Sequence, residues 1–257
     1  MFKEFSCLKS DELGLKKMMQ QVVEEVPLSI FINGRHYTTA LVSPALEKEF
    51  VLGHLFSERI ISGLADVESF ELEKRVARVI VSNPMRAIAS RRPIVSGCGG
   101  TASYLDESKL PEVTSDLRVS AEEIHSAIKA ISVSELHEAT GGVHSVGLFN
   151  KGSAVAIVED IGRHNALDKV IGAGLQDDID FSECYTASTG RISSDMALKC
   201  SGAKIPIIAS RGATTSLALM IAERTGLTII GFARGRRMNI YTRCDRIAGS
   251  PGPEKEG

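Results

Sequence analysis

The first half of the chain carries apolar and polar positions in short runs typical of strands. Residues 26–32 and 36–42 are rich in β-branched and aromatic side chains, and Asn33 and Gly34 lie between them. An Asn-Gly pair between two such runs is a strong signal for a tight hairpin, so the pattern predicts two antiparallel strands. Residues 70–72 and 76–81 predict a second pair of strands.

Between these two pairs the apolar positions repeat at helical spacing. Ser43 and Pro44 are residue types favoured at an N-cap and at the first helical position, respectively. Phe50 and Leu55 then contribute to an apolar face, and the helix is predicted to end near Gly63. Strands and helix together predict a small α+β unit.

The second half alternates between helical and strand patterns. Ser120 and Glu123 fit a capping box ahead of a helix, and residues 144–149 and 154–158 fit a hairpin. Further helices are expected near residues 166–171, 192–200 and 215–224, and strands near 184–187, 206–209 and 227–231. Such alternation is typical of a largely parallel sheet covered by helices. We therefore predict an α/β fold, with a small α+β domain over residues 22–115 and a three-layer α/β/α domain over residues 116–257.

Residues 82–112 interrupt both patterns, because they contain proline, glycine and basic residues without a sustained period. Long irregular segments within a compact chain are usually functional or disordered. Cys98 lies in this segment, within IVSGCGGT, with glycine on both sides. A structural cysteine normally packs among apolar neighbours, so this setting indicates a reactive thiol on a flexible loop.

Composition and charge restrict the class of function. The 257 residues are 43% hydrophobic and 24% charged, with a formal net charge of −2 and a pI near 6.3. Such a balance favours neither nucleic acid nor a membrane surface as a partner. The amino-terminal residues lack the apolar core of a signal peptide, and no run approaches the roughly 20 apolar residues of a membrane span. A cytoplasmic location is therefore the default expectation.

The cysteines indicate neither a structural metal site nor disulfide bonds. They are odd in number and form no C-x-x-C pair, so thiols are expected in a reducing compartment, at Cys7, Cys98, Cys184, Cys200 and Cys244. Cys184 and Cys200 fall on apolar faces and are expected in the core. No role is indicated for Cys7 and Cys244, which lie near the ends of the chain.

Polar, glycine-containing turns follow four of the predicted strands, at residues 158–165, 187–191, 210–215 and 231–239. Carboxyl ends of parallel strands meet at one edge of a sheet, which is where ligands bind in such folds. Arginines there suit phosphate, hydroxyls and glycine N–H groups suit its oxygens, and Asp160 suits the donor edge of a guanine-like ring. Capping explains each turn taken alone, but the four together favour a nucleotide-like ligand. His164 at a helix start is weak evidence alone, and His144 is interpreted as a hydrogen-bonded structural histidine.

Cys98 is the candidate for covalent chemistry. Arg86, Arg91 and Arg92 precede it, and nearby positive charge favours the reactive thiolate. A hydrolytic nucleophile would require a base from a histidine distant in sequence, such as His36, His54, His144 or His164. The sequence contains neither the zinc-deaminase motif nor the phosphate-binding loop of common NTPases. A sulfur relay fits better, because a thiolate can accept a sulfur as a persulfide and pass it to a bound acceptor.

Five segments of the chain carry a family resemblance. They are GGVH at 141–144, EDIGRHNALDK at 159–169, TGR at 189–191, ATTSLA at 213–218 and GFARGRRMNIYT at 231–242. These segments closely resemble the FdhD/NarQ family, the formate dehydrogenase accessory sulfurtransferases. The resemblance extends over nearly the whole chain from the Asn33-Gly34 hairpin onward, and EDIGRHNALDK is its most specific part.

The resemblance implies a cytidine-deaminase-like α/β/α domain beside a smaller domain, usually in a homodimer. It also implies a cysteine desulfurase as sulfur donor and formate dehydrogenase as client. The acceptor would be the molybdenum (or tungsten) bis-molybdopterin guanine dinucleotide cofactor, bound as a substrate. Cys98 matches the persulfide-carrying cysteine of the family. The family's cofactor-binding run matches Phe232, Ala233, Arg234, Gly235, Arg236 and Arg237, and we assign Arg163, His164 and Asn165 to the same site.

One position departs from the family pattern. Many members carry C-x-x-C in the cysteine loop, whereas Thr101 stands where the second cysteine would be. A single thiol can still carry a persulfide, but it cannot form a disulfide within that loop. Two main hypotheses stay open, a sulfurtransferase that uses Cys98 and a non-catalytic chaperone that binds and delivers the cofactor while Cys98 is idle. A cysteine-nucleophile hydrolase is ranked last, because it needs a histidine within hydrogen-bond reach of the sulfur.

Overall fold

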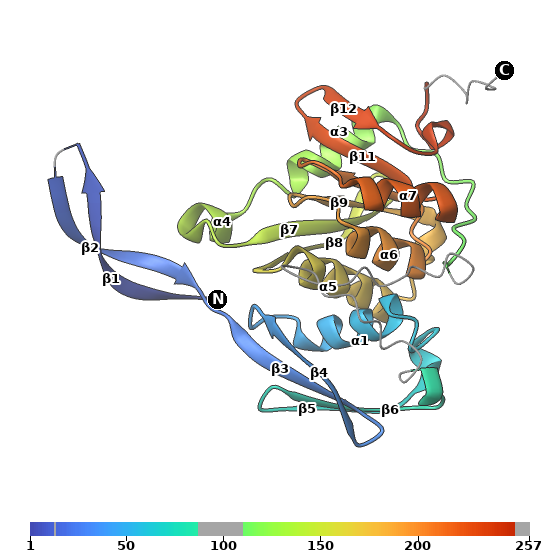
Figure 1. The fold of residues 1–257 in the computed structure, drawn as a ribbon, viewed down its shortest axis with the longest axis horizontal. Helices are drawn as coiled ribbons and strands as arrows, with labels where there is room; N and C mark the ends of the chain where they lie inside the picture. The colour runs from blue at the N-terminus through green and yellow to red at the C-terminus, as the bar shows by residue number, and fades with distance from the viewer. Residues whose placement is uncertain (13, 87–109, 250–257) are drawn as a thin grey trace.

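The computed structural model describes residues 1–12, 14–86 and 110–249. Within these ranges the chain forms a two-stranded arm, a small α+β domain and a larger α/β domain (Figure 1). The mixed α/β character predicted from the sequence is confirmed. Across the described ranges, no helix combines the length and the apolar composition needed to cross a membrane.

A four-stranded sheet in the order β4-β3-β6-β5 forms the small domain. Its elements are β3 (Val26–Ile32), β4 (Arg35–Val42), α1 (Glu47–Ser57), the short helix η1 (Leu64–Asp66), β5 (Val67–Glu73) and β6 (Val76–Val81). The predicted hairpin closes at Asn33 and Gly34, whose φ angles of 47° and 79° are both left-handed. A two-residue turn between twisted strands requires that region, which explains the Asn-Gly pair. Phe50 and Leu55 of α1 pack against buried residues of the sheet.

The prediction for the ends of α1 is wrong. The helix begins at Glu47, after Leu46 with a left-handed φ of 54°, and ends at Ser57 rather than near Gly63. Ser43 does not cap it. The Ser43 N–H donates to Asp160 Oδ2 at 3.0 Å, and Ser43 Oγ accepts from the N–H of Ile161 at 3.1 Å. A residue type that commonly caps helices is used here for a contact between the two domains.

A six-stranded sheet in the order β12-β11-β10-β9-β7-β8 forms the larger domain. The strands are β7 (His144–Asn150), β8 (Ser153–Asp160), β9 (Cys184–Ser188), β10 (Ile207–Ser210), β11 (Thr228–Arg234) and β12 (Arg237–Ile240). Strands β9, β10 and β11 are parallel, and β7 is antiparallel to both β8 and β9. Strand β8 therefore runs in the same direction as β9.

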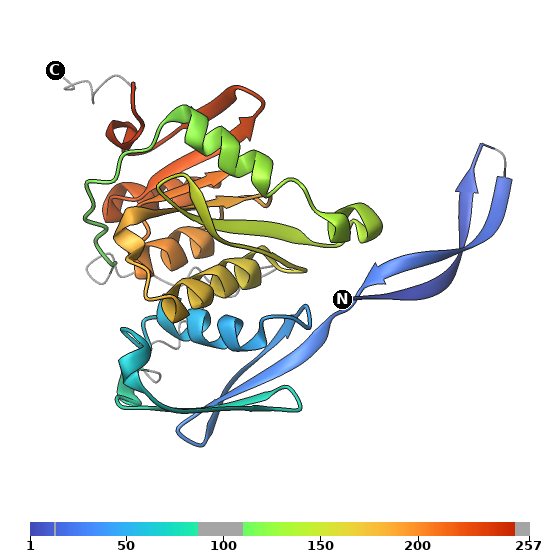
Figure 2. The same cartoon turned by 180° about the vertical axis from the view of Figure 1, so that it is seen from behind.

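Helices cover both faces of this sheet. On one face lie α5 (Arg163–Gln176), α6 (Ser194–Gly202) and α7 (Ser216–Thr225), whereas α3 (Ala121–Ala130) covers the other, as Figure 2 shows from behind. The predicted capping box starts α3, with Ser120 Oγ accepting from the Glu123 N–H and Glu123 Oε2 accepting from the Ser120 N–H. The short helices are α4 (Glu135–Thr140), η3 (Phe181–Glu183) and η4 (Cys244–Arg246).

Helices α1 and α5 cross at the junction between the domains. A Cβ on Gly53 would lie 1.8 Å from the Asp168 carbonyl oxygen, and one on Gly172 would lie 1.8 Å from that of Glu49. Buried ion pairs flank this crossing. Lys169 Nζ donates to Asp160 Oδ2 at 2.6 Å, and both side chains are fully buried. The junction therefore fixes one domain against the other by close backbone contact and by paired charges.

A second buried ionic group lies at the same junction. Lys199 Nζ is 2.9 Å from Asp168 Oδ2 and 3.1 Å from Glu58 Oε1, and His54 Nδ1 is 3.0 Å from Asp168 Oδ2. Burial alone would raise the pKa of Asp168, but Lys199 and His54 outweigh it and lower that pKa to about 2. Asp168 and Glu58 in turn raise the pKa of Lys199 against the effect of burial. Asp168, Glu58 and Lys199 stay charged in the interior because they are paired.

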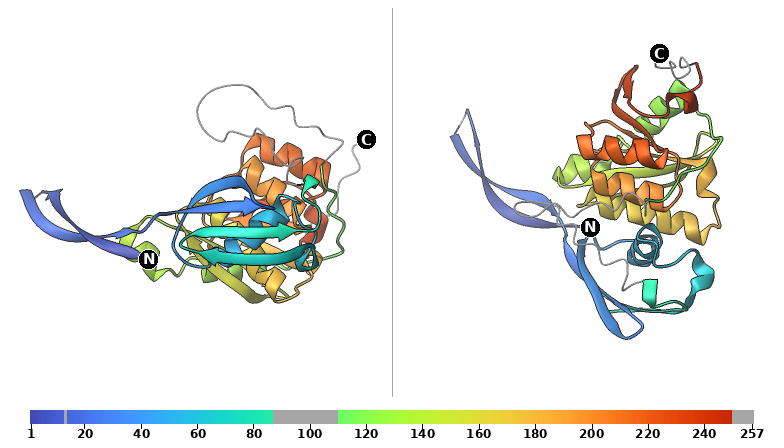
Figure 3. Two further views of the ribbon diagram at one scale, coloured as in Figure 1. Left: turned by 90° about the horizontal axis from the view of Figure 1, so that it is seen from below. Right: turned by 45° about the vertical axis from the view of Figure 1, so that its right-hand side comes forward.

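The arm consists of β1 (Phe2–Asp11) and β2 (Gly14–Val23), neither of which was predicted. It extends away from both domains, as the two views of Figure 3 show. Its root lies against α4, where Gln20 Nε2 donates to the Ala139 carbonyl at 3.3 Å. Strict alternation is missing from these residues, so the strand pattern could not be recognised.

Residues 110–115, which the sequence assigned to the end of the small domain, contact the larger one. The Val113 N–H donates to the Thr225 carbonyl at 2.7 Å, and Ser115 Oγ donates to the Ser182 carbonyl at 2.7 Å.

Candidate functional site

The four polar turns do meet at one edge of the six-stranded sheet. Strands β8, β9, β10 and β11 run in the same direction, so their carboxyl ends lie side by side. Helices α5, α6 and α7 begin just beyond the ends of β8, β9 and β10. Helix amino termini offer unpaired N–H groups, so this edge suits an anionic ligand.

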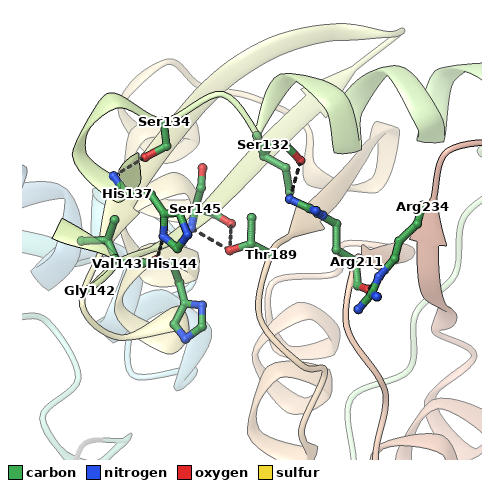
Figure 4. A pocket seen from close by; sticks show the side chains of 12 residues that line it. Ser132, Ser134, His137, Gly142, Val143, His144, Ser145, Thr189, Arg211 and Arg234 are labelled. Atoms are coloured by element: carbon green, nitrogen blue, oxygen red, sulfur yellow. Dashed lines mark hydrogen bonds between the residues drawn. The ribbon is translucent and has the colours of Figure 1, made fainter. Parts of the chain in front are cut away.

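A cavity of about 390 Å³ opens at this edge, between the end of α3, helix α4 and the strand ends. Figure 4 shows His137, His144 and Thr189 on one side of it and Arg211 and Arg234 on the other. Its lining also includes Ser132, Ser134, Gly141, Gly142 and Ser145.

Ser145 provides the sharpest sign of a ligand. This residue is 4% exposed and lines the cavity, and its Oγ has no hydrogen-bond partner among the described residues. Its N–H donates to Thr189 Oγ1 at 3.0 Å, so the backbone is fixed while the hydroxyl is not paired. A buried hydroxyl without a partner costs about 1–3 kcal/mol. A ligand that bonds to Ser145 Oγ would remove that cost.

Two arginines give the cavity an anion-binding wall. Arg234 Nε donates to the Arg211 carbonyl at 2.8 Å, and Arg211 Nη1 lies 3.3 Å from Ser132 Oγ. These bonds orient the two guanidinium groups while both side chains stay exposed. Paired guanidinium groups are well suited to phosphate oxygens.

Two histidines form the opposite wall. His137 Nδ1 lies 3.0 Å from the Val143 carbonyl and donates to it, which leaves Nε2 for other contacts. Burial lowers the pKa of His144, and Arg163 adds to the effect, so His144 is neutral near pH 7. No hydrogen bond to its ring occurs within the described ranges, so the interpretation of His144 as a hydrogen-bonded structural histidine is not supported.

Arg163 and His164 continue the site along the edge. A Cβ on Gly190 would lie 2.9 Å from Arg163 Cδ and 3.2 Å from His144 Nδ1, so glycine at 190 lets these two side chains lie close together. Arg163 Nε is buried without a hydrogen-bond partner among the described residues. His164 Nε2 bonds to Ser193 Oγ at 3.0 Å. Burial, and then Arg163, lower the pKa of His164 to about 4.

The predicted run 232–237 forms the end of β11 and its turn into β12. Arg234 lines the cavity, and Phe232 lies exposed at a bulge with a left-handed φ of 52°. Ala233 is buried, Gly235 has a φ of 57°, and Arg236 and Arg237 are exposed. A role of these residues in cofactor binding stays a prediction.

Two assigned residues face the domain junction instead. Asn165 Nδ2 donates to the Leu41 carbonyl at 2.8 Å and to Asp160 Oδ1 at 2.9 Å. Asp160 is fully buried and also accepts from Lys169, Ser43 and the Gly162 N–H. Its oxygens are occupied, so the interpretation of Asp160 as the contact for a guanine-like ring is wrong. The side chain at the end of β8 turns toward α1 and α5 rather than toward the cavity.

The proposed sulfur carrier, Cys98, lies outside the described residues, as do Arg91, Arg92 and Thr101. Arg86 is described, and its Nη1 donates to Ser62 Oγ at 2.6 Å on the small domain.

Among the described cysteines, Cys184 and Cys200 are buried in the core, as predicted. Burial raises their pKa values to about 11 and about 12. Both are protonated near pH 7 and are poor nucleophiles. Cys7 is exposed on the arm, and Cys244 is half-buried.

Sequence reasoning missed the residues from α4 and the start of β7. Helix α4 has only six residues, too few for a helical period to be recognised. His137, Gly141 and Gly142 therefore received no role, and Ser145 was treated only as part of a strand. The signal that could have identified these residues is GGVH at 141–144, which carries part of the family resemblance but was not assigned to the site.

Comparison with known proteins gives consistent results. The model of the FdhD/NarQ family matches residues 23–248. The chain is 34% identical over 248 residues to the sulfur carrier protein FdhD of Methanothermobacter thermautotrophicus, covering 96% of this chain and 99% of that protein. It is 36% identical over 252 residues to the protein of the same name from Saccharolobus solfataricus, covering 95% and 98%. The crystal structure of a formate dehydrogenase accessory protein from Desulfotalea psychrophila superposes with a TM-score of 0.80 at 28% identity, covering 96% of this chain and 99% of that one.

Proposed function

The chain belongs to the FdhD/NarQ family, and on that basis we propose that it is a sulfurtransferase required for formate dehydrogenase activity. The observation that carries this proposal is the match, over almost the full length of both proteins, to relatives named sulfur carrier proteins. The donor would be a cysteine desulfurase, and the protein would act in the cytoplasm as a homodimer. A cytidine-deaminase-like α/β/α fold of the larger domain is part of the same proposal.

The acceptor in this proposal is the molybdenum (or tungsten) bis-molybdopterin guanine dinucleotide cofactor, bound as a substrate at the carboxyl edge of the six-stranded sheet. Arg211 and Arg234 suit its phosphates, and the unpaired Ser145 hydroxyl and the neutral His144 suit polar groups of a ring. A cavity of about 390 Å³ has room for one nucleotide end of such a ligand and not for the whole. The rest would extend along the edge toward Arg163.

Cys98 is the proposed carrier of the sulfur. Its thiolate attacks the outer sulfur of a persulfide on the desulfurase, the old S–S bond breaks, and the donor cysteine leaves as a thiolate. No electrons are gained or lost overall in this exchange. The two buried cysteines, Cys184 and Cys200, are poor candidates because burial keeps them protonated.

The test of the carrier uses two matched variants of the full chain, Cys98→Ala and Cys7→Ala. Each is incubated with a cysteine desulfurase and cysteine, and its intact mass is measured. Wild type and Cys7→Ala should gain one sulfur atom that a reductant removes, whereas Cys98→Ala should gain none. A partner formate dehydrogenase that is fully active with Cys98→Ala would instead support the non-catalytic chaperone.

The test of the pocket uses GDP as the probe. Losing one charge-assisted contact of 1.5–3 kcal/mol should make Arg234→Gln bind GDP about 10-fold to 100-fold more weakly than wild type. Arg118→Gln, at an exposed arginine that does not line the cavity, serves as the control and should bind like wild type. Equal GDP affinities of wild type, Arg234→Gln and Arg118→Gln would exclude the cavity as the binding site.

A further inference from the structure

The root of the β1–β2 arm lies against the wall of the cavity. The described residues of the arm up to position 17 are exposed, whereas several nearer the root are partly buried. At the root, Gln20 Nε2 donates to the Ala139 carbonyl of α4 at 3.3 Å. Val23 packs so closely on Gly142 that a Cβ on the glycine would lie 2.7 Å from Val23 Cγ1. Because Gly142 lines the cavity, the arm touches a residue of the candidate ligand site.

Helix α4, which forms this part of the wall, depends on outside contacts for its position. It has six residues, and one of them, Leu136, is buried. A helix this short is not stable alone in water, so its place is set by what it touches. Ser134 at its start donates to Glu159 of β8. At its other end Gln20 binds the carbonyl of Ala139, one of the last four carbonyls, which have no partner within a helix. The arm therefore holds the carboxyl end of α4.

The turn between α4 and β7 lies outside the six-stranded sheet. Strand β7 pairs with β8 from His144 onward, whereas Gly142 comes before the strand. The next residue, Val143, accepts from His137 Nδ1 at 3.0 Å, so a shift of the turn moves the His137 ring as well. These residues line one side of the cavity, and the arginines on its other side come from the ends of β10 and β11 (Figure 4). A displaced turn would therefore change the separation of the two walls.

We propose that the arm root positions the ligand cavity, with Gln20 and Val23 as positioning residues. They place α4 and the turn at Gly142, and these in turn place His137 opposite the two arginines. This inference rests on the proposed binding of a nucleotide end in the cavity. It adds that the affinity for that ligand depends on arm residues that do not line the cavity. Because coupling between two sites is reciprocal, a bound ligand should also hold the arm root more firmly.

Gly142 allows the wall to be displaced from the side of the arm alone. Its backbone lies outside the left-handed region, so alanine suits its conformation. The added Cβ would be too close to Val23 Cγ1, and valine is stiff at χ1, so the turn or the arm must move. The same Cβ would lie 3.5 Å from Val23 Cβ, an ordinary contact, and the next atom is Thr140 Oγ1 at 3.8 Å. Shortening Val23 to alanine therefore removes the conflict.

The test measures the dissociation constant of GDP by titration calorimetry on the full chain. Gly142→Ala should bind GDP about 10-fold more weakly than wild type, the equivalent of one hydrogen bond lost from the displaced wall. Val23→Ala leaves a gap behind the turn and should bind about 3-fold more weakly. The double variant should bind within about 2-fold of wild type, because the two Cβ atoms meet at an ordinary distance. The control Val22→Ala changes the neighbouring valine, which is 41% exposed on the opposite face of β2, and should bind like wild type.

Hydrogen exchange of residues 135–142 without ligand reports on the wall itself, separately from GDP binding. Exchange should be faster in each single variant and return to the wild-type rate in the double variant. Additive effects of the two substitutions, on exchange or on GDP affinity, would overturn the positioning role. If wild type binds GDP and the variants bind it equally well, the arm root does not position the site, although the proposed function stands. If wild type binds no GDP, the ligand cavity of the proposed function and this inference both fail.

Discussion

Charged and apolar side chains are enclosed at the α1–α5 junction, whereas those of the β1–β2 arm face solvent. At the junction, Asp160 and Lys169 are fully buried and 2.6 Å apart. Lys3 in the arm and Glu24, just beyond its end, are 3.0 Å apart, but the lysine side chain is 64% exposed. An exposed pair contributes little because water and salt screen it, whereas breaking a buried pair costs about 3–5 kcal/mol. Ion pairs between similar residue types therefore contribute very differently to stability in the two regions.

The difference follows from what surrounds each element. Glycine at positions 53 and 172 lets the backbones of α1 and α5 touch, which excludes water and makes each charge dependent on its partner. Among the described residues, the arm is contacted near its root, and its outer residues are exposed and contribute little to stability. The junction is enclosed within one chain, whereas most of the arm is exposed. The predictions below test this contrast.

Removal of Lys199 should have the largest effect. In Lys199→Met, Asp168 stays buried without its cation, so the free energy of unfolding should fall by about 3–5 kcal/mol. The control Lys129→Met changes an exposed lysine on α3 and should change stability by less than about 0.5 kcal/mol. Urea unfolding followed by circular dichroism measures both. Equal stability of the two variants would mean that the buried pair does not hold the junction together.

The second-largest loss of stability is expected from adding a methyl group at the crossing of α1 and α5. Gly172→Ala puts a Cβ about where the Glu49 carbonyl oxygen lies, so the helices must separate. We expect a loss of about 3 kcal/mol, at the upper end of the usual cost of overpacking. Gly63→Ala is the matched control, since a Cβ there meets no atom within 4 Å and its φ of 174° suits any residue. A similar urea midpoint for both variants would contradict the close crossing.

Acid should weaken the junction over a defined range of pH. The pKa of Asp168 is about 2 in the folded protein, below its ordinary value, because Lys199 and His54 outweigh burial. A lowered carboxyl pKa stabilises the folded state above the unfolded value and loses that effect as pH falls through the folded value. Stability should therefore fall by roughly 2 kcal/mol between about pH 5 and pH 2. Asp168→Asn should show a shallower pH dependence there, whereas an unchanged slope would exclude Asp168 as its source.

Most elements of the two domains could be predicted because their signals are local. Asn33-Gly34 fixes its hairpin, Ser120 and Glu123 fix the start of α3, and alternating patterns give the strands and helices of the large sheet. The prediction of the start of α1 was wrong for a non-local reason. Ser43 has the chemistry of an N-cap, but its bonds go to Asp160 and Ile161, more than a hundred residues away.

The candidate site was predictable in outline and not in detail. Parallel strand order alone brings the turns of β8, β9, β10 and β11 to one edge, which placed Arg163 and Arg234 at the site. Whether a side chain at that edge faces the cavity depends on tertiary contacts. Asp160 turns to Lys169, whereas Ser145, within a strand, faces the cavity with its hydroxyl unpaired. Local pattern does not distinguish these two directions.

The smallest expected effect belongs to the arm, and it should depend on concentration. Leu8→Ala alters a side chain that is 67% exposed in one chain, so at high dilution stability should change by less than about 0.5 kcal/mol. Leu28→Ala, in β3, removes a fully buried side chain and should cost about 2–5 kcal/mol at every concentration. If the arm packs onto a second copy, binding stabilises only the folded chain, so the Leu8→Ala deficit should grow with chain concentration while that of Leu28→Ala stays constant. Thermal unfolding at several concentrations measures both deficits. A constant, large loss for Leu8→Ala would show that the arm is part of the core of its own chain, and the contrast between the two regions would fail.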